Sequence, residues 1–248
     1  GDVYKRQDQN PLIKPIIGIE AYVAPSTRKS RVQEFWGTSR DAGDPDAEGG
    51  KDVSGGGRYT HMTMWAKDSE GLHNLFRLSS LASYEGYYMK PRMDRELMGQ
   101  YSGGIIASTG CPSGEVQTRL RLGQFEEACQ AASDYRDIFG RENYFCELMD
   151  HGVPIEKQVR SDLLKLAKKL DIPLLVTNDS HYVTEDQADA HDSLLCVGVG
   201  RNKDDPNRFR FNGSGYYIKS SEQMRALFPD HPEACDNTLL LTEMIGSY

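Results

Sequence analysis

Short apolar runs that alternate with amphipathic helical patterns are the feature of this sequence that most constrains its fold. The first run, 16–23, stops before Pro25, and a later run, 174–176, follows the amphipathic stretch 155–170. The other expected strands are 59–65, 105–109 and 143–148, and the other expected helices are 70–83, 115–122, 125–139 and stretches that begin near residues 185 and 221. A repeated strand–helix order favours an α/β fold with a parallel sheet.

The composition fits one large domain. The chain has 248 residues, of which 38% are hydrophobic, so it can bury a sizeable core. No apolar run approaches the length of a membrane span and the start lacks a signal-peptide core, so we expect a cytoplasmic protein. Five cysteines without a CxxC pair argue against a disulfide framework. A net charge of -8 disfavours a broad phosphate-binding surface, whereas clustered carboxylates would suit divalent metals.

The segment at about 26–58 interrupts the alternation of strands and helices. It is polar and contains two glycine runs, 49–50 and 55–57. A loop of this length inside a domain is usually either functional or disordered. We therefore expect a flexible insertion between the first strand and the second.

Side chains that bind metals well stand close to the ends of several apolar runs. Asp179 and His181 are two residues apart, so both point to the same side of an extended chain. Alone, such a pair is more often a hydrogen-bonded surface feature. Glu20, His61 and Cys111, however, occupy similar places after other runs. Because parallel barrels build their active sites at the carboxyl ends of their strands, we expect these five residues to form one metal site.

The donor types indicate the kind of metal. Carboxylate and imidazole ligands favour Zn, Mn or Fe over calcium, and the cysteine favours Zn or Fe. Two or three ions would suit phosphodiester or phosphomonoester hydrolysis. Each ligand also has a structural alternative. Cys111 could be a small buried side chain, and His61 a strand-edge histidine. Glu20 could pair with Arg119 or Arg121.

Other histidines receive less weight. Asp150 and His151 form a further candidate pair, although the following Gly152 favours a plain turn. His73 and His191 lie within helical patterns, and we place both outside the site.

Two arginines are candidates for nucleic-acid contact. Arg208 and Arg210 alternate with aromatic residues at the start of the stretch 208–219. Cations and rings in this pattern could pair with and stack on single-stranded nucleic acid. An ordinary hairpin, with aromatic side chains inward and cations outward, would explain the same pattern.

Five segments resemble those of a known family, in the same order along the chain. They are KPIIGIEAY (14–22), GLHNLFRLSS (71–80), TGCPSGEV (109–116), TNDSHYV (177–183) and DPNRF (205–209). Together they resemble the PHP (polymerase and histidinol phosphatase) domain of the alpha subunit of bacterial DNA polymerase III, a C-family polymerase, in its actinobacterial form. The resemblance extends from about residue 13 to residue 241.

The resemblance implies a distorted (β/α)7 barrel with three metal ions at the carboxyl ends of its strands. By position, its ligands would include Glu20, His61, Cys111, Asp179 and His181, with Asp179 and His181 acting catalytically through activated water. Members that keep all ligands are metal-dependent 3′–5′ exonucleases that proofread new DNA, whereas in others the domain is structural. The implied partners are DNA, the other polymerase domains and replisome subunits, and no membrane.

The chain also departs from the family pattern. The family's opening strand with its His-x-His motif, and the next unit with an Asp-His-Gly turn, do not precede Lys14. We therefore expect residues 8–248 to form an incomplete barrel without its first strand–helix units, inactive alone and without a polymerase site. Residues 1–7 resemble translated adapter sequence and are expected to be non-native. A stand-alone phosphoesterase of the histidinol-phosphatase kind and a non-catalytic PHP scaffold stay open as alternatives.

Overall fold

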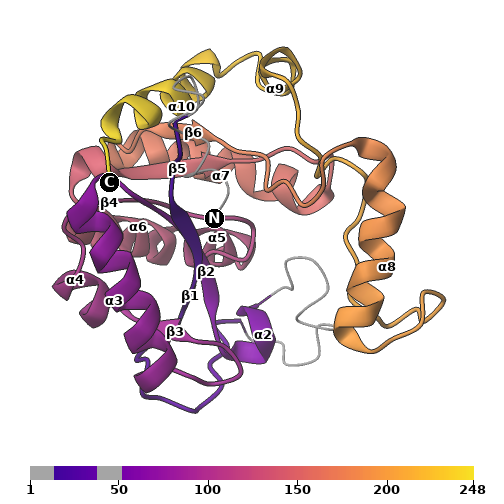
Figure 1. Cartoon of the computed structure of the whole chain (residues 1–248), viewed down its shortest axis with the longest axis horizontal. Helices are drawn as coiled ribbons and strands as arrows, with labels where there is room; N and C mark the ends of the chain where they lie inside the picture. Colours follow the sequence, from indigo (N-terminus) through magenta and orange to yellow (C-terminus); the bar gives the residue numbers. More distant parts are fainter. Residues whose placement is uncertain (1–13, 38–51) are drawn as a thin grey trace.

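A six-stranded sheet forms the centre of the computed structural model, which describes residues 14–37 and 52–248 (Figure 1). The strands are β1 (Gly18–Val23), β2 (Thr60–Ala66), β3 (Arg92–Met93), β4 (Ile105–Ser108), β5 (Tyr144–Leu148) and β6 (Leu174–Val176). Their order across the sheet is β3-β1-β2-β4-β5-β6. The expected α/β class is confirmed, and the strands predicted from apolar runs lie close to their expected bounds.

One strand, β2, runs against both of its neighbours. It pairs antiparallel with β1, where His61 is opposite Tyr22, and with β4, where Thr63 is opposite Ser108. The pairs β1–β3, β4–β5 and β5–β6 are parallel. The prediction of a fully parallel sheet was therefore wrong at β2. Parallel neighbours need a crossover, usually a helix. Full helices connect β4 to β5 and β5 to β6, whereas the described residues between β1 and β2 contain only the four-residue helix Ser54–Gly57.

Helices cover the outer face of the sheet. They are α3 (Ser69–Glu85), α4 (Arg95–Gln100), α5 (Glu115–Arg121), α6 (Phe125–Phe139) and α7 (Pro154–Leu170). Asp68 and Asp94 cap the first two by accepting hydrogen bonds from backbone N–H groups of the first helical turn. Alternate strand residues, such as Met62 and Met64 of β2, pack against these helices in the main core. In the described part of the chain, no helix combines the length and apolar character needed to cross a bilayer.

The inner face of the sheet changes from apolar to polar along the strands. At one end, a second apolar cluster joins the strands to α10 (Pro232–Met244) and the residue after it; it comprises Ile106, Phe145, Leu175, Leu241 and Ile245. Further along, the buried Glu147 carboxylate accepts hydrogen bonds from the Ser108 and Thr177 hydroxyls. Burial raises the pKa of Glu147. The polar end of the inner face is the end at which β1, β4, β5 and β6 finish.

The strands form an open sheet across the described residues, with β3 and β6 at its two edges, which is consistent with an incomplete barrel. Beyond β6 the chain forms the 3-10 helix η2 (Glu185–Gln187), α8 (Ala188–Val199) and α9 (Ser221–Leu227). Figure 1 shows α8 at the right, apart from the other helices. Residues 208–219 are all described and contain no strand, only a bridge between Tyr182 and Tyr217. The hairpin alternative for this stretch was therefore wrong.

The first described part of the predicted insertion is anchored to the body. Arg28 is buried and forms ion pairs with three acids. Its partners are Glu85, Asp94 and Glu96, at nitrogen–oxygen distances of 2.8, 2.9 and 3.1 Å. Asp94 is itself buried. This contact fixes the chain that leaves β1 against the start of α4.

The second described part of the insertion is anchored as well. The Asp52 carboxylate accepts hydrogen bonds from the backbone N–H groups of Trp36 and Gly37, at 2.8 and 2.9 Å. The short α2 (Ser54–Gly57) follows and leads into β2. Residues 38–51 lie outside the described residues, as do residues 1–7, which we expected to be non-native.

Two glycine-to-alanine substitutions should have opposite effects on stability. A Cβ atom on Gly71 of α3 would lie 1.7 Å from the backbone oxygen of Gly104, whereas one on Gly99 of α4 would meet nothing within 4 Å. Alanine is a better helix former than glycine by up to about 1 kcal/mol. Overpacking costs about 1–3 kcal/mol. In urea unfolding we expect Gly71→Ala to lose at least about 1 kcal/mol and Gly99→Ala to gain about 0.5–1 kcal/mol. Equal gains would contradict the close approach of α3 to this turn.

Candidate metal centre

Three of the expected ligand residues meet at one edge of the sheet. Glu20 lies within β1, His61 is the second residue of β2, and Cys111 lies in the turn that follows β4. We expected His61 to follow a strand, and this was wrong, because a strand begins there. Since β2 is antiparallel to its neighbours, its first residues lie beside the carboxyl ends of β1 and β4. The reversal of β2 therefore brings His61 to the same edge as the other two.

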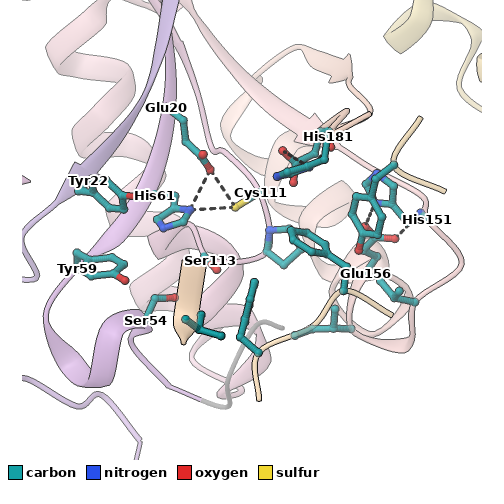
Figure 2. Close-up of a pocket in the computed structure, with 18 of the residues that line it drawn as sticks. Glu20, Tyr22, Ser54, Tyr59, His61, Cys111, Ser113, His151, Glu156 and His181 are labelled. Atoms are coloured by element: carbon teal, nitrogen blue, oxygen red, sulfur yellow. Dashed lines mark hydrogen bonds and ion pairs between the residues drawn. The ribbon is translucent and has the colours of Figure 1, made fainter. Parts of the chain in front are cut away.

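The three side chains contact one another, as the dashed lines in Figure 2 show. His61 Nδ1 lies 2.9 Å from Glu20 Oε1. Cys111 Sγ lies 3.5 Å from His61 Nδ1 and 3.7 Å from Glu20 Oε1. One potential ligand atom from each residue falls within 4.8 Å of the others. We call Glu20, His61 and Cys111 the donor group.

The structural alternatives for these residues do not match the contacts. Cys111 contacts the polar atoms of Glu20 and His61, so it is not merely a small buried side chain of the core. Glu20 interacts with His61 and Cys111. Of its suggested arginine partners, Arg119 donates to the Gln124 side chain and Arg121 to the backbone oxygen of Pro112.

The protonation states within the donor group depend on one another. Burial opposes a charge on His61, but the neighbouring Cys111 and Glu20 raise the pKa of His61 well above its usual value. Burial also raises the pKa of the Cys111 thiol, with His61 acting in the opposite direction. The hydrogen bond with His61 lowers the pKa of Glu20. Without a metal, His61 and Cys111 thus keep their protons to higher pH than the isolated side chains would.

Zinc affinity is expected to increase with pH. Metal ligands must be deprotonated, and both His61 and Cys111 have raised pKa values, so binding has to displace their protons. Below those pKa values, the affinity should rise by about tenfold per pH unit for each proton released. Calorimetry in buffers of different ionisation enthalpy counts these protons. An affinity that is constant between about pH 6 and about pH 8 would exclude both residues as ligands.

Asp179 and His181 line the same cavity as the donor group. The cavity has a volume of about 590 Å³, and all five expected ligand residues contribute to its lining. Burial raises the pKa of Asp179, while the charges of His181 and Glu20 act on it in opposite directions. The structure therefore brings three expected ligands into direct contact. It places the other two on the same cavity but outside the group of atoms within 4.8 Å.

A hydrogen bond fixes which nitrogen of His181 is available. Its Nδ1 lies 2.7 Å from the backbone oxygen of Asp179, and because a carbonyl oxygen only accepts, Nδ1 must donate. In the neutral ring this leaves Nε2 as the acceptor, which is the nitrogen that can hold a metal. Asp179 has a φ of 40°, so the chain turns sharply at this point.

His151 and Glu156 also belong to the cavity wall. The predicted turn is present, with Gly152 at a φ of 79°, but His151 nevertheless lines the cavity. His151 Nδ1 lies 2.5 Å from Glu156 Oε1, and its Nε2 donates to the backbone oxygen of Asn178 at 2.7 Å. Burial opposes protonation of His151, but Glu156 raises its pKa. Because Asn178 precedes Asp179, this pair holds the segment that carries Asp179.

An aromatic cluster surrounds His181. Its ring centroid lies 4.6 Å from that of Phe211 and 5.3 Å from that of His191, which belongs to α8. Tyr216 stacks on His151 with a centroid distance of 4.0 Å. His191 is not among the residues that line the cavity, although the position of α8 brings its ring beside that of His181; its place outside the site stays a prediction. His73 is exposed on α3, as expected of a surface histidine.

The two arginines expected to contact nucleic acid differ in their surroundings. Arg208 is buried, and its two terminal nitrogens lie 2.6 Å from the two carboxylate oxygens of Asp192. Arg210 is exposed and donates to the backbone oxygen of Asp205. Arg208 thus holds α8 to the following segment, and Arg210 has the better access to solvent. Contact with nucleic acid stays a prediction for both.

The donor group fits a divalent transition metal. A carboxylate, an imidazole and a thiolate are ligands of Zn and Fe, and the first two also suit Mn. Their atoms are already gathered within 4.8 Å of one another, so binding would need only small movements of the side chains. The fixed ring orientation of His181 is typical of histidines that serve as metal ligands.

Fold and site agree with the sequence comparisons. A family model described as PHP domain matches residues 2–151. The chain belongs to the PHP domain family, and its donor group is a possible metal-binding triad.

Among curated proteins, the chain is 58% identical over 248 residues to DNA polymerase III subunit alpha of Saccharopolyspora erythraea. It is 55% identical over 238 residues to the subunit of Mycobacterium leprae and 37% identical over 235 residues to that of Thermus aquaticus. These alignments cover 100%, 95% and 94% of this chain, but only 21%, 20% and 18% of the relatives. The chain thus spans about a fifth of their length.

Proposed function

We propose that this chain works as the PHP domain of a DNA polymerase III alpha subunit in DNA replication, and that its cavity is a metal-dependent 3′–5′ exonuclease site for proofreading. One observation carries the proposal: the donor group opens onto the same cavity as Asp179 and His181. The names of the relatives support the replication context. DNA, the other polymerase domains and replisome subunits would be the partners, in the cytoplasm.

Each residue of the site has a role in this proposal. Two or three divalent ions, of Zn, Mn or Fe, would supply activated water and neutralise charge on the attacking and leaving oxygens. Glu20, His61 and Cys111 would hold metal from the β1–β2–β4 edge, and Asp179 and His181 from the other side of the cavity. Asp179 and His181 would also orient the attacking water.

Access of DNA to the site would be local. The net charge of -8 argues against a broad phosphate-binding surface on this chain. Arg210 is the exposed cation of the 208–219 stretch that we expected to contact nucleic acid, and Phe211 beside it lines the cavity. A single strand that enters along this stretch would reach Asp179 and His181 with its 3′ end.

The proposal can be tested in the Saccharopolyspora erythraea alpha subunit, with this chain replacing the aligned segment. We expect manganese-dependent release of nucleotides from the 3′ end of a 5′-labelled single strand, followed on sequencing gels. Asp179→Ala should slow this release by at least about 100-fold. Asp230→Ala removes an exposed aspartate and is the matched control. Primer extension by the same preparations shows that each variant is folded.

Each other outcome points to a different function. Equal release by the Asp179→Ala and Asp230→Ala proteins would end the exonuclease proposal. Full primer extension by a protein whose PHP cavity holds no metal would favour the non-catalytic scaffold. Hydrolysis of p-nitrophenyl phosphate without cleavage of DNA would favour a phosphoesterase of the histidinol-phosphatase kind. The genomic sequence upstream of Asp8 tests whether residues 1–7 are non-native and whether further strand–helix units precede them.

A further inference from the structure

The cavity has two unlike walls. Figure 2 shows Tyr22, Ser54 and Tyr59 together on one side of the donor group, with His151 on the other side. We call the first three residues the hydroxyl wall. The opposite side includes the aromatic rings of Phe211 and Tyr216, which are 4.7 Å apart between centroids. Hydroxyl groups suit phosphate or sugar oxygens, whereas rings suit a nucleobase.

A lysine stands at the hydroxyl wall. Lys90 lines the cavity and is half-buried, and its Nζ lies 5.3 Å from the centroid of the Tyr22 ring. A contact of this kind is weak near the surface, but it favours a position of the ammonium group beside the Tyr22 ring. Lys90 therefore presents a positive charge to the cavity from the same side as the hydroxyl groups.

This charge is not neutralised by an acid among the described residues. Two arginines also line the cavity, Arg201 and Arg208, and both pair with aspartates, at 3.2 and 2.6 Å. Across the described ranges, Lys90 forms no ion pair within 4.0 Å. In a chain with more acidic than basic residues, a cavity lysine without an acidic partner among the described residues can attract an anion.

The backbone holds Lys90 in a tight turn between α3 and β3. The N–H group of Tyr88 donates to the backbone oxygen of Lys90 at 3.0 Å, and Met89 between them has a φ of 65°. A left-handed conformation is unfavourable for a residue other than glycine. The Met89 side chain is 64% exposed, so its own packing does not account for the strain. Pro91 further restricts the backbone of Lys90.

We propose that Lys90 binds a phosphate group of the substrate, together with the hydroxyl wall. The inference rests on the proposed phosphoester hydrolysis at this cavity. Glu20, Asp179 and Glu156 are carboxylates of the same lining, so a phosphate needs a positive charge besides bound metal ions to stay near them. A hydrogen bond from an ammonium group to a phosphate oxygen is charge-assisted and stronger than a neutral one.

The test measures binding of inorganic phosphate to the manganese-loaded chain, together with its manganese content. We expect Lys90→Gln to weaken phosphate binding by about tenfold or more and Lys90→Arg to keep it within about threefold. Both variants should hold as much manganese as the wild-type chain, which also shows that they are folded. Lys168→Gln removes an exposed lysine of α7 that lies outside the cavity, and it is the matched control.

Further measurements identify the source of the phosphate. They also separate the proposal for Lys90 from the exonuclease proposal. Displacement of bound phosphate by a short single strand at lower concentration than by p-nitrophenyl phosphate supports DNA as the source. In the cleavage assay, Lys90→Gln should raise KM more than it lowers kcat. Phosphate binding that depends on Lys90, together with no DNA cleavage by the hybrid Saccharopolyspora erythraea subunit, would sustain this inference and end the exonuclease proposal. Equal phosphate binding by the Lys90→Gln and Lys168→Gln proteins, or none by the wild-type chain, would overturn the inference.

Discussion

Replacing His61 with alanine is expected to lower the affinity of the chain for Zn²⁺ or Mn²⁺ by at least about 100-fold. His61 lies between the two other members of the donor group, because its Nδ1 is 2.9 Å from the Glu20 carboxylate and 3.5 Å from the Cys111 sulfur. Its loss removes one ligand and leaves a carboxylate and a thiol facing each other. A competition titration against a chromogenic chelator measures the change.

The matched control for this substitution is His73→Ala. His73 is an exposed histidine on α3 and does not line the cavity, so its removal changes the composition in the same way without touching the donor group. We expect the wild-type metal affinity for this variant. If the two variants lost affinity equally, or if neither did, the donor group would not be a metal site. Far-UV circular dichroism of both variants shows whether the fold is retained.

Arg28→Met is expected to destabilise the fold by about 3–5 kcal/mol, the range found when one partner of a buried ion pair is removed. Arg28 and Asp94 have side chains only 6% and 3% exposed. The Asp94 carboxylate also caps α4 by accepting from the backbone of Leu97, so it cannot turn out to solvent without cost. The other partners, Glu85 and Glu96, are more exposed and should contribute little.

The control for this prediction is the neighbouring residue. Lys29 is exposed, and Lys29→Met should change the free energy of unfolding by no more than about 0.5 kcal/mol in urea. Burial would raise the pKa of Asp94, but hydrogen bonds from Arg28 and Leu97 hold it below its usual value. The wild-type protein should therefore lose stability as the pH falls through this lowered pKa, and Arg28→Met should lose less there. Similar unfolding free energies for the two variants would contradict the anchoring role of Arg28.

The sequence was sufficient to predict most helices and strands but not the direction of each strand. The bounds of α6 were predicted as they are observed, because a long amphipathic pattern identifies a helix by itself. The direction of β2 depends on how the chain returns after β1, and no local pattern records this. β3 has two residues and α4 has six, which is too short for a periodic signal. α10 was missed although it is longer, since only a few of its side chains are buried.

The residues of the site were easier to predict than its geometry. Glu20, His61 and Cys111 were identifiable because residues of ligand type stood close to the ends of apolar runs. That they touch one another depends on the pairing of β1, β2 and β4, which is a property of the folded sheet. The position of Lys90 at the cavity was not predictable. It depends on the left-handed backbone conformation of Met89, which no sequence pattern indicates. His191 reaches His181 through the placement of α8.

The two hydrogen bonds of the Asp52 carboxylate have a practical consequence for engineering. They hold Gly37 and Asp52 together, so the two described residues on either side of 38–51 lie next to each other. Because the two ends are already joined, lengthening the connection between them costs little, at about 0.6 kcal/mol for each doubling of its length. A fluorescent reporter could therefore be inserted between these residues. Glu20 and His61 would keep their spacing, because the hydrogen bonds between β1 and β2 set it.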